Sequence, residues 1–250
     1  MKMLVVIPAR HASTRFPGKP LVMIHSKSMI QRVYEQALKC TTVNDVLVAT
    51  DDERIEKAVK SFGGKVMMTS SLHQSGTERC AEVVQNAGED YDVVINVQGD
   101  EPFISPEQID LVAKCFNDPT VHIATLIKRI SKVDELSNTS IVKAVVGEQL
   151  QALYFSRSPL PHFRGIPAEQ WLSSGIYYKH IGIYGYRTNV LEQLVKLPPH
   201  NLEQAESLEQ LRWLANGYRI KTAITLLETI SIDTPRDLET ALQFSKENKL

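Results

Sequence analysis

Short, continuous apolar runs alternate with helical patterns through the first half of the chain. The runs cover residues 4–7, 46–49 and 93–97 and are rich in β-branched side chains. Between them, residues 29–38 and 54–62 carry apolar side chains at the spacing of an amphipathic helix. Strands that are apolar on both faces and alternate with helices are typical of a parallel sheet covered on both sides. The pattern therefore predicts an α/β fold built on a doubly wound, mostly parallel sheet.

The second half of the chain has a different pattern, in which strands dominate. Strands are predicted over residues 141–146, 151–155, 178–186 and 220–227. The strongest helical pattern is expected to form a single long helix over residues 202–216. Residues 156–174 combine proline, glycine and aromatic side chains with little periodicity, which indicates a long loop that is either mobile or faces substrate. We therefore expect a mixed region of the sheet with a smaller lobe.

Composition narrows the class of protein further. The chain has 250 residues, of which 43% are apolar and 23% charged, as in ordinary globular proteins. Its 28 Lys and Arg residues nearly balance 29 Asp and Glu residues, so no basic excess favours nucleic acid as a partner. The early apolar run is too short for a signal peptide, and no run approaches the ~18 apolar residues of a membrane span. Three widely spaced cysteines, without a C-x-x-C pair, predict reduced thiols in a cytoplasmic protein that has no membrane partner.

Residues 8–20, directly after the first predicted strand, are the first candidate for binding chemistry. In open α/β sheets the ligand crevice lies beyond the carboxyl ends of the strands. The segment holds Arg10, Arg15 and Lys19 together with two hydroxyls and a glycine, a combination that suits an oligophosphate. It matches neither the Walker A pattern nor G-x-G-x-x-G. The alternative, a solvated basic turn, is disfavoured by the position at a strand end.

Motifs along the whole chain resemble one protein family. Residues 8–21, Pro-Ala-Arg-x-x-Ser-Thr-Arg-x-Pro-Gly-Lys-Pro-Leu, resemble the nucleotide-binding signature of sugar nucleotidyltransferases. Within that superfamily, further motifs are similar to the 3-deoxy-D-manno-octulosonate (Kdo) cytidylyltransferase family: HQSGTER at 73–79, NVQGDEP at 96–102, ALYFSR at 152–157, KHIGIYGY at 179–186, LEQLR at 208–212 and DTP at 233–235. The resemblance implies a Rossmann-type, nucleotide-diphospho-sugar transferase-like fold. It also implies a single domain over residues 1–250, with a nucleotide-binding half over about 1–125 and a sugar-binding and dimerisation half over about 126–250.

Asp100 and Asp233 are the candidate ligands of a Mg²⁺ ion. Asp100 follows the predicted strand 93–97 by a tight turn at Gly99, so its carboxylate is expected to face the crevice. A hard cation would share it there with phosphate oxygens. The resemblance implies that Asp233 is the second metal ligand, although the sequence from Asp233 also fits a helix start capped by Thr234. Both interpretations can hold, since Thr234 can cap while Asp233 faces the metal.

The resemblance assigns the nucleotide to two motifs. In the first, Arg10, Arg15 and Lys19 are implied to bind the triphosphate and to act in catalysis with the two aspartates. The motif at 73–79 is expected to open a helix whose N-terminus favours anions, although a simple Ser or Thr cap explains it as well. Gln98 is implied to lie near the reacting groups. The substrate-binding residues predicted on this side are Ala9, Arg10, Ser13, Thr14, Arg15, Lys19, Ser75, Gly76, Thr77, Arg79 and Gln98.

The predicted strand over residues 178–186 is a candidate platform for a sugar. Alternation of side chains puts His180 and Tyr184 on one face, with Gly182 leaving a gap between their rings. Along a straight strand the two residues are ~13 Å apart, so both would contact the same ligand only if it is elongated, as an eight-carbon sugar acid is. A purely structural histidine is the alternative interpretation.

The resemblance implies that Arg157, Glu209 and Gln210 complete the sugar site. Arg157 follows a predicted strand and offers a planar fork to a carboxylate. Glu209 and Gln210 lie beside the apolar stripe of the predicted long helix, where they can bind hydroxyls or form exposed salt bridges. Residues 158–178 depart from the family pattern, and no role is assigned to them.

The resemblance implies a nucleotidyltransferase that transfers CMP from CTP to the anomeric hydroxyl of Kdo, with Mg²⁺ as cofactor and pyrophosphate as the second product. It further implies a cytoplasmic homodimer that supplies lipopolysaccharide synthesis. Such a transfer proceeds by positioning and charge neutralisation and needs no covalent intermediate. Two alternatives stay open. The acceptor can be 8-amino-Kdo or a sialic acid, or the chain can be a non-catalytic nucleotide-binding module, against which the two separated aspartates argue.

Overall fold

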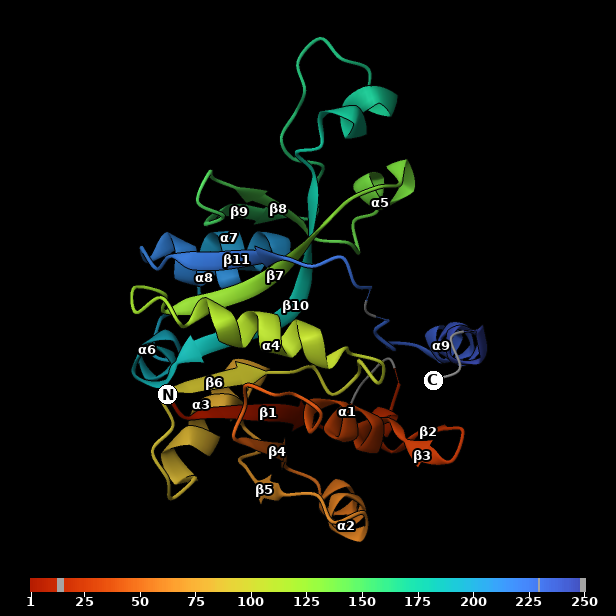
Figure 1. Cartoon of the computed structure of the whole chain (residues 1–250), viewed down its shortest axis with the longest axis vertical. Helices are drawn as coiled ribbons and strands as arrows, with labels where there is room; N and C mark the ends of the chain where they lie inside the picture. Colours follow the sequence, from red (N-terminus) through yellow and green to blue (C-terminus); the bar gives the residue numbers. More distant parts are fainter. Residues whose placement is uncertain (13–15, 229, 248–250) are drawn as a thin grey trace.

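A computed structural model of the chain describes residues 1–12, 16–228 and 230–247. Its central sheet has the strand order β11-β7-β10-β6-β1-β4-β5 (Figure 1). The strands are β1 (Met3–Ala9), β4 (Asp45–Thr50), β5 (Val66–Met68), β6 (Val93–Asn96), β7 (Ile123–Arg129), β10 (Tyr178–Arg187) and β11 (Ile220–Ile224). Strands β6, β1, β4 and β5 are parallel to one another and β11 is parallel to β7, whereas β10 runs antiparallel to both of its neighbours. The predicted mixed, mostly parallel α/β sheet is confirmed.

Helices cover both faces of this sheet. One face carries α1 (Met29–Ala37), α2 (Glu53–Ser61) and α4 (Pro106–Cys115), and the other carries α3 (Gly76–Asn86), α6 (Thr188–Leu194) and α8 (Gln210–Ala215). Strand β1 explains why two cores form, because Val5 and Ile7 join the first core while Leu4 and Val6 join the second. The continuous apolar run at the start of the chain is thus buried from both sides.

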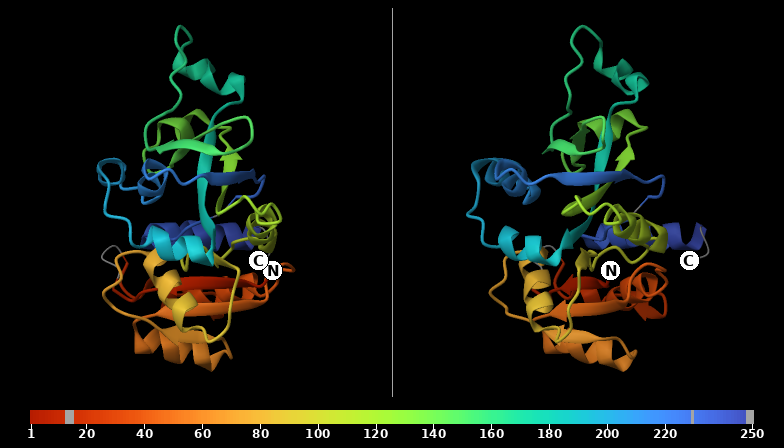
Figure 2. Two further views of the ribbon diagram at one scale, coloured as in Figure 1. Left: turned by 90° about the vertical axis from the view of Figure 1, so that its left-hand side faces the viewer. Right: turned by 60° about the vertical axis from the view of Figure 1, so that its left-hand side comes forward.

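A smaller lobe extends from one end of the sheet. Strands β8 (Lys143–Val146) and β9 (Ala152–Ser156) form a hairpin that pairs with β10 through β8. Helix α5 (Val133–Ser137) and the 3-10 helix η2 (Ala168–Ser174) lie beyond it, and the segment around η2 projects away from the body of the molecule (Figure 2). Ile130, Leu136 and Tyr177 form a small apolar cluster at its base.

The prediction of a single long helix over residues 202–216 is wrong. The structure has two helices, α7 (Asn201–Glu206) and α8, with Ser207 between them in the left-handed region at φ 51°. The N–H of Leu208 bonds back to the carbonyl of Glu203 at 3.1 Å, which closes α7. A tertiary contact also favours the end of the helix here. Arg157 Nε donates to the carbonyl oxygen of Glu206 at 2.7 Å, an acceptor that a continuous helix would use for its own backbone.

The C-terminal helix α9 (Pro235–Glu247) packs on a third apolar cluster near the start of the chain. The cluster joins Ile232 and Ala241 to Ile24, Met29 and Phe103. It thereby brings α9 to the hairpin of β2 (Met23–Ile24) and β3 (Lys27–Ser28), which follows the 3-10 helix η1 (Lys19–Leu21). Over the described part of the chain, no helix is both long and apolar enough to cross a membrane.

Candidate functional site

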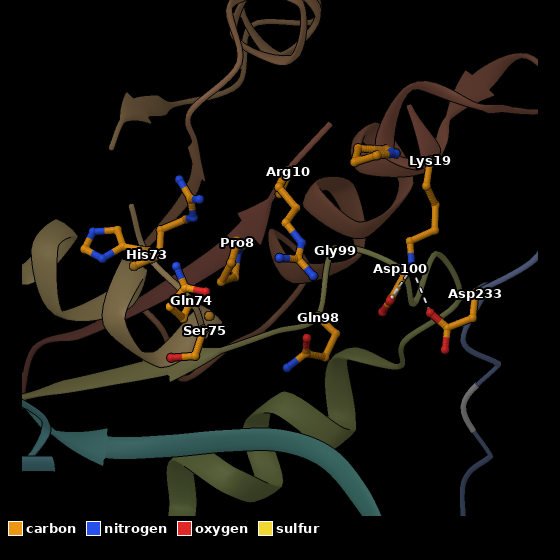
Figure 3. A pocket seen from close by; sticks show the side chains of 14 residues that line it. Pro8, Arg10, Lys19, His73, Gln74, Ser75, Gln98, Gly99, Asp100 and Asp233 are labelled. Atoms are coloured by element: carbon orange, nitrogen blue, oxygen red, sulfur yellow. Dashed lines mark hydrogen bonds and ion pairs between the residues drawn. The ribbon is translucent and has the colours of Figure 1, made fainter. Parts of the chain in front are cut away.

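A polar cleft of about 230 Å³ lies beyond the carboxyl ends of β1 and β6 (Figure 3). This is the edge at which open α/β sheets bind ligands. Segments from distant parts of the chain surround it, namely the end of β1, η1, the start of α3, the turn after β6 and the residues before α9. The lining residues are Pro8, Ala9, Arg10, Lys19, Pro20, His73, Gln74, Ser75, Gly76, Arg79, Gln98, Gly99, Asp100 and Asp233.

At one end of the cleft, Lys19 lies between two carboxylates. Its Nζ donates to Asp100 Oδ2 at 2.7 Å and to Asp233 Oδ1 at 3.1 Å (Figure 3). Asp100 reaches this place through Gly99, where a Cβ atom would come within 2.8 Å of the carbonyl oxygen of Pro8. Only glycine lets the turn after β6 pack so closely on the end of β1. The three side chains on which the predicted metal and phosphate site depends therefore meet around one cleft.

Asp233 is held by the start of α9. The N–H of Ile232 donates to the carbonyl of Asp100 at 2.9 Å, which ties the two aspartate segments together. The carboxylate of Asp237 accepts the N–H groups of Asp233 at 3.0 Å and of Thr234 at 2.8 Å, and the Thr234 hydroxyl lies 3.3 Å from the N–H of Asp237. This is the reciprocal arrangement of a capping box. Thr234 starts a helix while Asp233 faces the cleft, so the two interpretations of this motif are compatible.

The donor set at this end fits a small, hard cation. Both carboxylates approach the same nitrogen, so one ion near that position would have two anionic oxygen ligands. Mg²⁺ commonly takes one or two carboxylates and fills its remaining positions with phosphate oxygens and water. Among the described residues, no three or more His, Cys, Asp or Glu side chains form a cluster that could hold a metal ion.

The other end of the cleft is formed by the start of α3. Ser75 caps the helix, since its hydroxyl accepts the N–H of Glu78 at 3.2 Å. Arg79 is only 4% exposed; its guanidinium donates to the hydroxyl of Thr69 and lies 3.5 Å from Asp51. Arg10, by contrast, is exposed and extends over the middle of the cleft in Figure 3. Cations thus lie along the cleft from end to end.

Several predicted residues line the cleft and others do not. Those that line it are Ala9, Arg10, Lys19, Ser75, Gly76, Arg79, Gln98, Asp100 and Asp233. Ser13, Thr14 and Arg15 lie outside the described residues. Thr77 is buried, and its hydroxyl donates to Glu209 Oε2 at 2.6 Å rather than facing the cleft. His73 and Gln74 were missed, although they belong to the same motif as Ser75, and His73 Nε2 lies 2.5 Å from Glu82.

Glu101 is a third residue that the sequence analysis did not single out. It is 6% exposed, and its Oε2 has no hydrogen-bond partner within the described residues. Burial, together with the charge of Asp100, raises the pKa of Glu101 to about 8. The side chain is therefore mostly protonated at pH 7, which limits the negative charge beside Asp100.

The predicted separation of His180 and Tyr184 is wrong. Their ring centroids are 5.2 Å apart, because the register of β10 against β7 shifts between Ile181 and Tyr184. Thr125 lies opposite the bulge; its hydroxyl donates to the carbonyl of Ile183 at 2.7 Å and lies 3.0 Å from His180 Nε2. A bulge shortens the strand locally, which a straight-strand estimate does not include. Burial lowers the pKa of His180 to about 3, so the ring is neutral at pH 7.

The turn after β6 connects the cleft to β10. The side-chain amide of Gln98 donates to the carbonyl of Gly182 at 3.2 Å. A Cβ atom at Gly182 would have no neighbour closer than 4.0 Å, so there is open space beside this glycine. Gln98 therefore lines the cleft and also contacts the strand that carries His180 and Tyr184.

Glu209 and Gln210 begin α8 and are less accessible than predicted. Gln210 is 6% exposed, and Glu209 is half-buried. Burial raises the pKa of Glu209, while the bond from Thr77 and the charge of Arg212 oppose that shift. The prediction of two residues on an open helix face is corrected, because the break at Ser207 turns the start of α8 toward α3.

Arg157 lies at the base of the smaller lobe and is not among the residues that line the cleft. Its Nη1 donates to the carbonyl of Thr139 at 3.0 Å, in addition to the contact with Glu206 described above. Lys143, which is fully buried, donates to the carbonyls of Asn138, Ile141 and Arg157 itself. The structure therefore places Arg157 in a firmly held segment away from the two aspartates.

Comparisons with known proteins agree on one family. A family model described as cytidylyltransferase matches residues 4–224. A relative from Bacteroides thetaiotaomicron, named 3-deoxy-manno-octulosonate cytidylyltransferase, is 56% identical over 250 residues, which cover 98% of this chain and 99% of the relative. A relative of the same name from Thermodesulfovibrio yellowstonii is 49% identical, with 96% and 97% covered.

Solved structures lead to the same group. A structure of CMP:2-keto-3-deoxy-manno-octonic acid synthetase complexed with CTP superimposes with a TM-score of 0.92 at 45% identity, and covers 99% of this chain and 100% of that chain. A putative glucose-1-phosphate thymidylyltransferase from Bacillus anthracis superimposes with a TM-score of 0.66 at 15% identity. The second likeness shows a common fold alone.

Proposed function

The chain belongs to the cytidylyltransferase family, and from this premise we propose that it transfers CMP from CTP to the anomeric hydroxyl of Kdo. It is a nucleotidyltransferase, as its named relatives across the full length of the chain are. The observation that carries the proposal is the meeting of Lys19, Asp100 and Asp233 around one cleft at the carboxyl edge of the sheet. Cations and carboxylates in one cleft are what a magnesium nucleotide requires.

The reaction replaces one bond to phosphorus by another. The C2 hydroxyl oxygen of Kdo forms a bond to the α-phosphorus of CTP, the bond from that phosphorus to the bridging oxygen breaks, and pyrophosphate leaves as the hydroxyl proton is lost. Such transfers are accelerated mainly by positioning and by neutralisation of charge. We assign Arg10 and Lys19, together with Arg15 of the same motif, to the triphosphate and the departing pyrophosphate.

Asp100 and Asp233 would hold Mg²⁺. When bound, the ion reduces repulsion between the oxygens of the nucleotide and the incoming hydroxyl. The role of the chain is to hold the two carboxylates at the same end of the cleft. Gly99 and the Asp237 cap support this assignment, because each holds one aspartate segment at its backbone.

We place the sugar acid on the β10 side of the cleft, with Gln98 at the boundary. His180, Tyr184, Glu209, Gln210 and Arg157 are the residues proposed for it. The bond from Gln98 to Gly182 supports this placement, since it joins the cleft to β10. On this scheme residues 1–125 bind the nucleotide, and residues 126–250 bind the sugar and form a dimer.

We further propose a cytoplasmic homodimer whose product is used in lipopolysaccharide synthesis. Exposed apolar side chains on the projecting lobe, Ile166 at 39% and Ile176 at 44%, support a second copy as a partner. The three cysteines are free, which fits a reducing compartment.

Pyrophosphate release tests the proposal directly. With CTP, Kdo and Mg²⁺ the protein is expected to turn over, and Asp100→Ala should lower the rate by roughly two orders of magnitude or more while the circular dichroism spectrum is retained. Asp90→Ala, at an exposed position away from the cleft, is the matched control and should keep the wild-type rate. A wild-type rate in Asp100→Ala would remove the metal assignment.

The same assay separates the alternatives. With CTP held constant, Kdo, 8-amino-Kdo and a sialic acid are compared as acceptors, and Kdo is expected to give the highest kcat/KM. Preference for another acid would change the substrate. Binding of CTP without pyrophosphate release with any acid would favour a non-catalytic nucleotide-binding module.

A further inference from the structure

Thr77 makes a short hydrogen bond between two elements that carry different parts of the site. Its hydroxyl donates to Glu209 Oε2 at 2.6 Å, across 132 positions of the sequence. Thr77 lies in the first turn of α3 and is 3% exposed, and Glu209 directly precedes the first residue of α8. The bond thus connects the helix that borders the cleft to the segment proposed to bind the sugar acid.

The carboxylate of Glu209 depends on this bond. A partly buried carboxylate needs hydrogen-bond donors to replace the water that it has lost. The nearest cation is Arg212, whose Nη2 lies 3.5 Å from Glu209 Oε1 but also donates to Glu203 at 2.8 Å. Arg212 is therefore shared between two carboxylates. The Ser75 side chain also hydrogen-bonds to this carboxylate, but the bond from Thr77 has the larger effect on the pKa of Glu209. At 2.6 Å the Thr77 hydroxyl lies closer than Arg212 and holds Oε2 of Glu209.

The position of the Thr77 hydroxyl is set from the cleft side. The two preceding residues, Ser75 and Gly76, line the cleft. Gly76 packs tightly, since a Cβ atom there would lie 3.3 Å from Asn96 Nδ2 and 3.4 Å from Pro8 Cγ. The start of α3 thus has little freedom to shift. Because Thr77 follows directly, the direction of its hydroxyl is determined by the same rigid turn that borders the nucleotide.

We propose that Thr77 is a positioning residue, which orients Glu209 for the acceptor sugar acid from the helix that borders the nucleotide cleft. The proposal rests on the proposed function, because it requires that Glu209 binds the sugar acid. Without the Thr77 hydroxyl, Glu209 Oε2 loses its donor at 2.6 Å and the carboxylate shifts toward Arg212 and Ser75, so its oxygens no longer meet the acceptor in the same geometry. Binding of the sugar acid then weakens, whereas CTP keeps all its contacts in the cleft.

Thr77→Val and Thr77→Ser form a matched pair of tests. Valine keeps the shape of threonine and removes the hydroxyl, whereas serine keeps the hydroxyl. We expect Thr77→Val to raise the KM for Kdo about tenfold, the effect of one lost bond to a charged group. The KM for CTP should stay within about twofold, and Thr77→Ser should restore the KM for Kdo. Equal increases in both KM values for Thr77→Val, or an unchanged KM for Kdo, overturn the proposal.

A double-mutant cycle with Glu209→Ala separates positioning from a general loss of structure. If Thr77 acts through Glu209, Thr77→Val adds less than about a twofold change once Glu209 is alanine. If the increases in the KM for Kdo caused by the two substitutions multiply in the double variant, the proposal is overturned. If the Thr77→Val variant does not fold, Thr77→Ala takes its place in the cycle. An unchanged KM for Kdo in Glu209→Ala, in a protein that releases pyrophosphate, overturns the positioning role alone. Failure of the wild-type protein to use Kdo contradicts the proposed function instead.

Discussion

His180 is enclosed by aromatic rings. Its ring centroid lies 5.1 Å from that of Phe155 and 5.2 Å from that of Tyr184. Burial lowers the pKa of His180 from 6.5 to about 3, because a charged imidazolium would lose its hydration there. The ring therefore serves as a neutral hydrogen-bonding group next to Thr125, and it resists protonation that the unfolded chain accepts.

The stability of the protein is expected to fall on acidification because of His180. Between about pH 6.5 and pH 3 the unfolded chain binds a proton that the folded protein excludes, so the free energy of unfolding decreases as the pH falls through this window. The decrease is at most about 1.4 kcal/mol per pH unit. Urea unfolding of His180→Gln at pH 7, 6 and 5 should show a shallower decrease than the wild-type protein. His122→Gln, at an exposed position, should keep the wild-type slope; an identical slope in His180→Gln would contradict the assignment.

Sequence motifs identify candidate functional residues well, but they do not identify the residues to which these side chains are hydrogen-bonded. Lys19 and Asp100 could be predicted to share one crevice, because each follows the end of a predicted strand, whereas Asp233 was assigned to it only through the family resemblance. The partner of Thr77 could not be predicted in this way. A threonine at the start of a helix has the same sequence pattern whether its hydroxyl caps the helix, binds a ligand or bonds to a distant carboxylate. Pairing over such a separation is a property of the tertiary structure.

In strand β10, two glycines with similar sequence surroundings differ in how closely other residues pack against them. Gly182 and Gly185 both interrupt an apolar, alternating pattern. A Cβ atom at Gly185 would come within 2.6 Å of the ring of Phe116 and 2.9 Å of Val112, both in α4 or at its end. At Gly182 the same atom would meet nothing closer than 4.0 Å. Close packing therefore requires glycine at position 185, whereas there is open space beside Gly182.

Two alanine substitutions in β10 should therefore differ in their effect on stability. Gly185→Ala forces a methyl group into the core between β10 and α4, and is expected to lower the free energy of unfolding by about 1–3 kcal/mol. Gly182→Ala has room for its methyl group and should stay within about 0.5 kcal/mol of the wild-type protein. Denaturant unfolding of the two variants measures the difference. Equal losses of stability would mean that strand propensity, rather than packing on α4, governs both positions.

Element boundaries in the second half were harder to predict than those in the first. The strands at residues 4–7, 46–49 and 93–97 are confirmed, because burial from both sides leaves an unbroken apolar signal. The break at Ser207 leaves no comparable signal. Leu208 and Leu211 continue the helical spacing, but α7 ends at Ser207 in the left-handed region, where Arg157 donates to the carbonyl of Glu206.

In the folded molecule, the C-terminal helix α9 packs against segments from the first part of the chain. Helix α9 packs on the hairpin of β2 and β3 and on Phe103, and the segment before it bonds to the carbonyl of Asp100. The cleft is therefore complete only when α9 is docked, because Asp233 precedes this helix directly. Nucleotide binding and the docking of α9 should be linked through the carboxylate of Asp233.

Hydrogen exchange can measure this linkage. If Asp233 and Asp100 hold the metal of a bound nucleotide, CTP with Mg²⁺ should slow amide exchange in residues 235–246, and CTP with EDTA should protect the start of α3 without that effect on α9. At 100 times its dissociation constant the nucleotide contributes about 2.7 kcal/mol, which corresponds to a rise of about 5–10 °C in Tm. Asp233→Asn should abolish the protection of α9 while protection at residues 75–79 remains. If α9 is protected equally with and without Mg²⁺, the helix responds to the nucleotide by a route other than Asp233, and the second metal ligand must be sought elsewhere in the cleft.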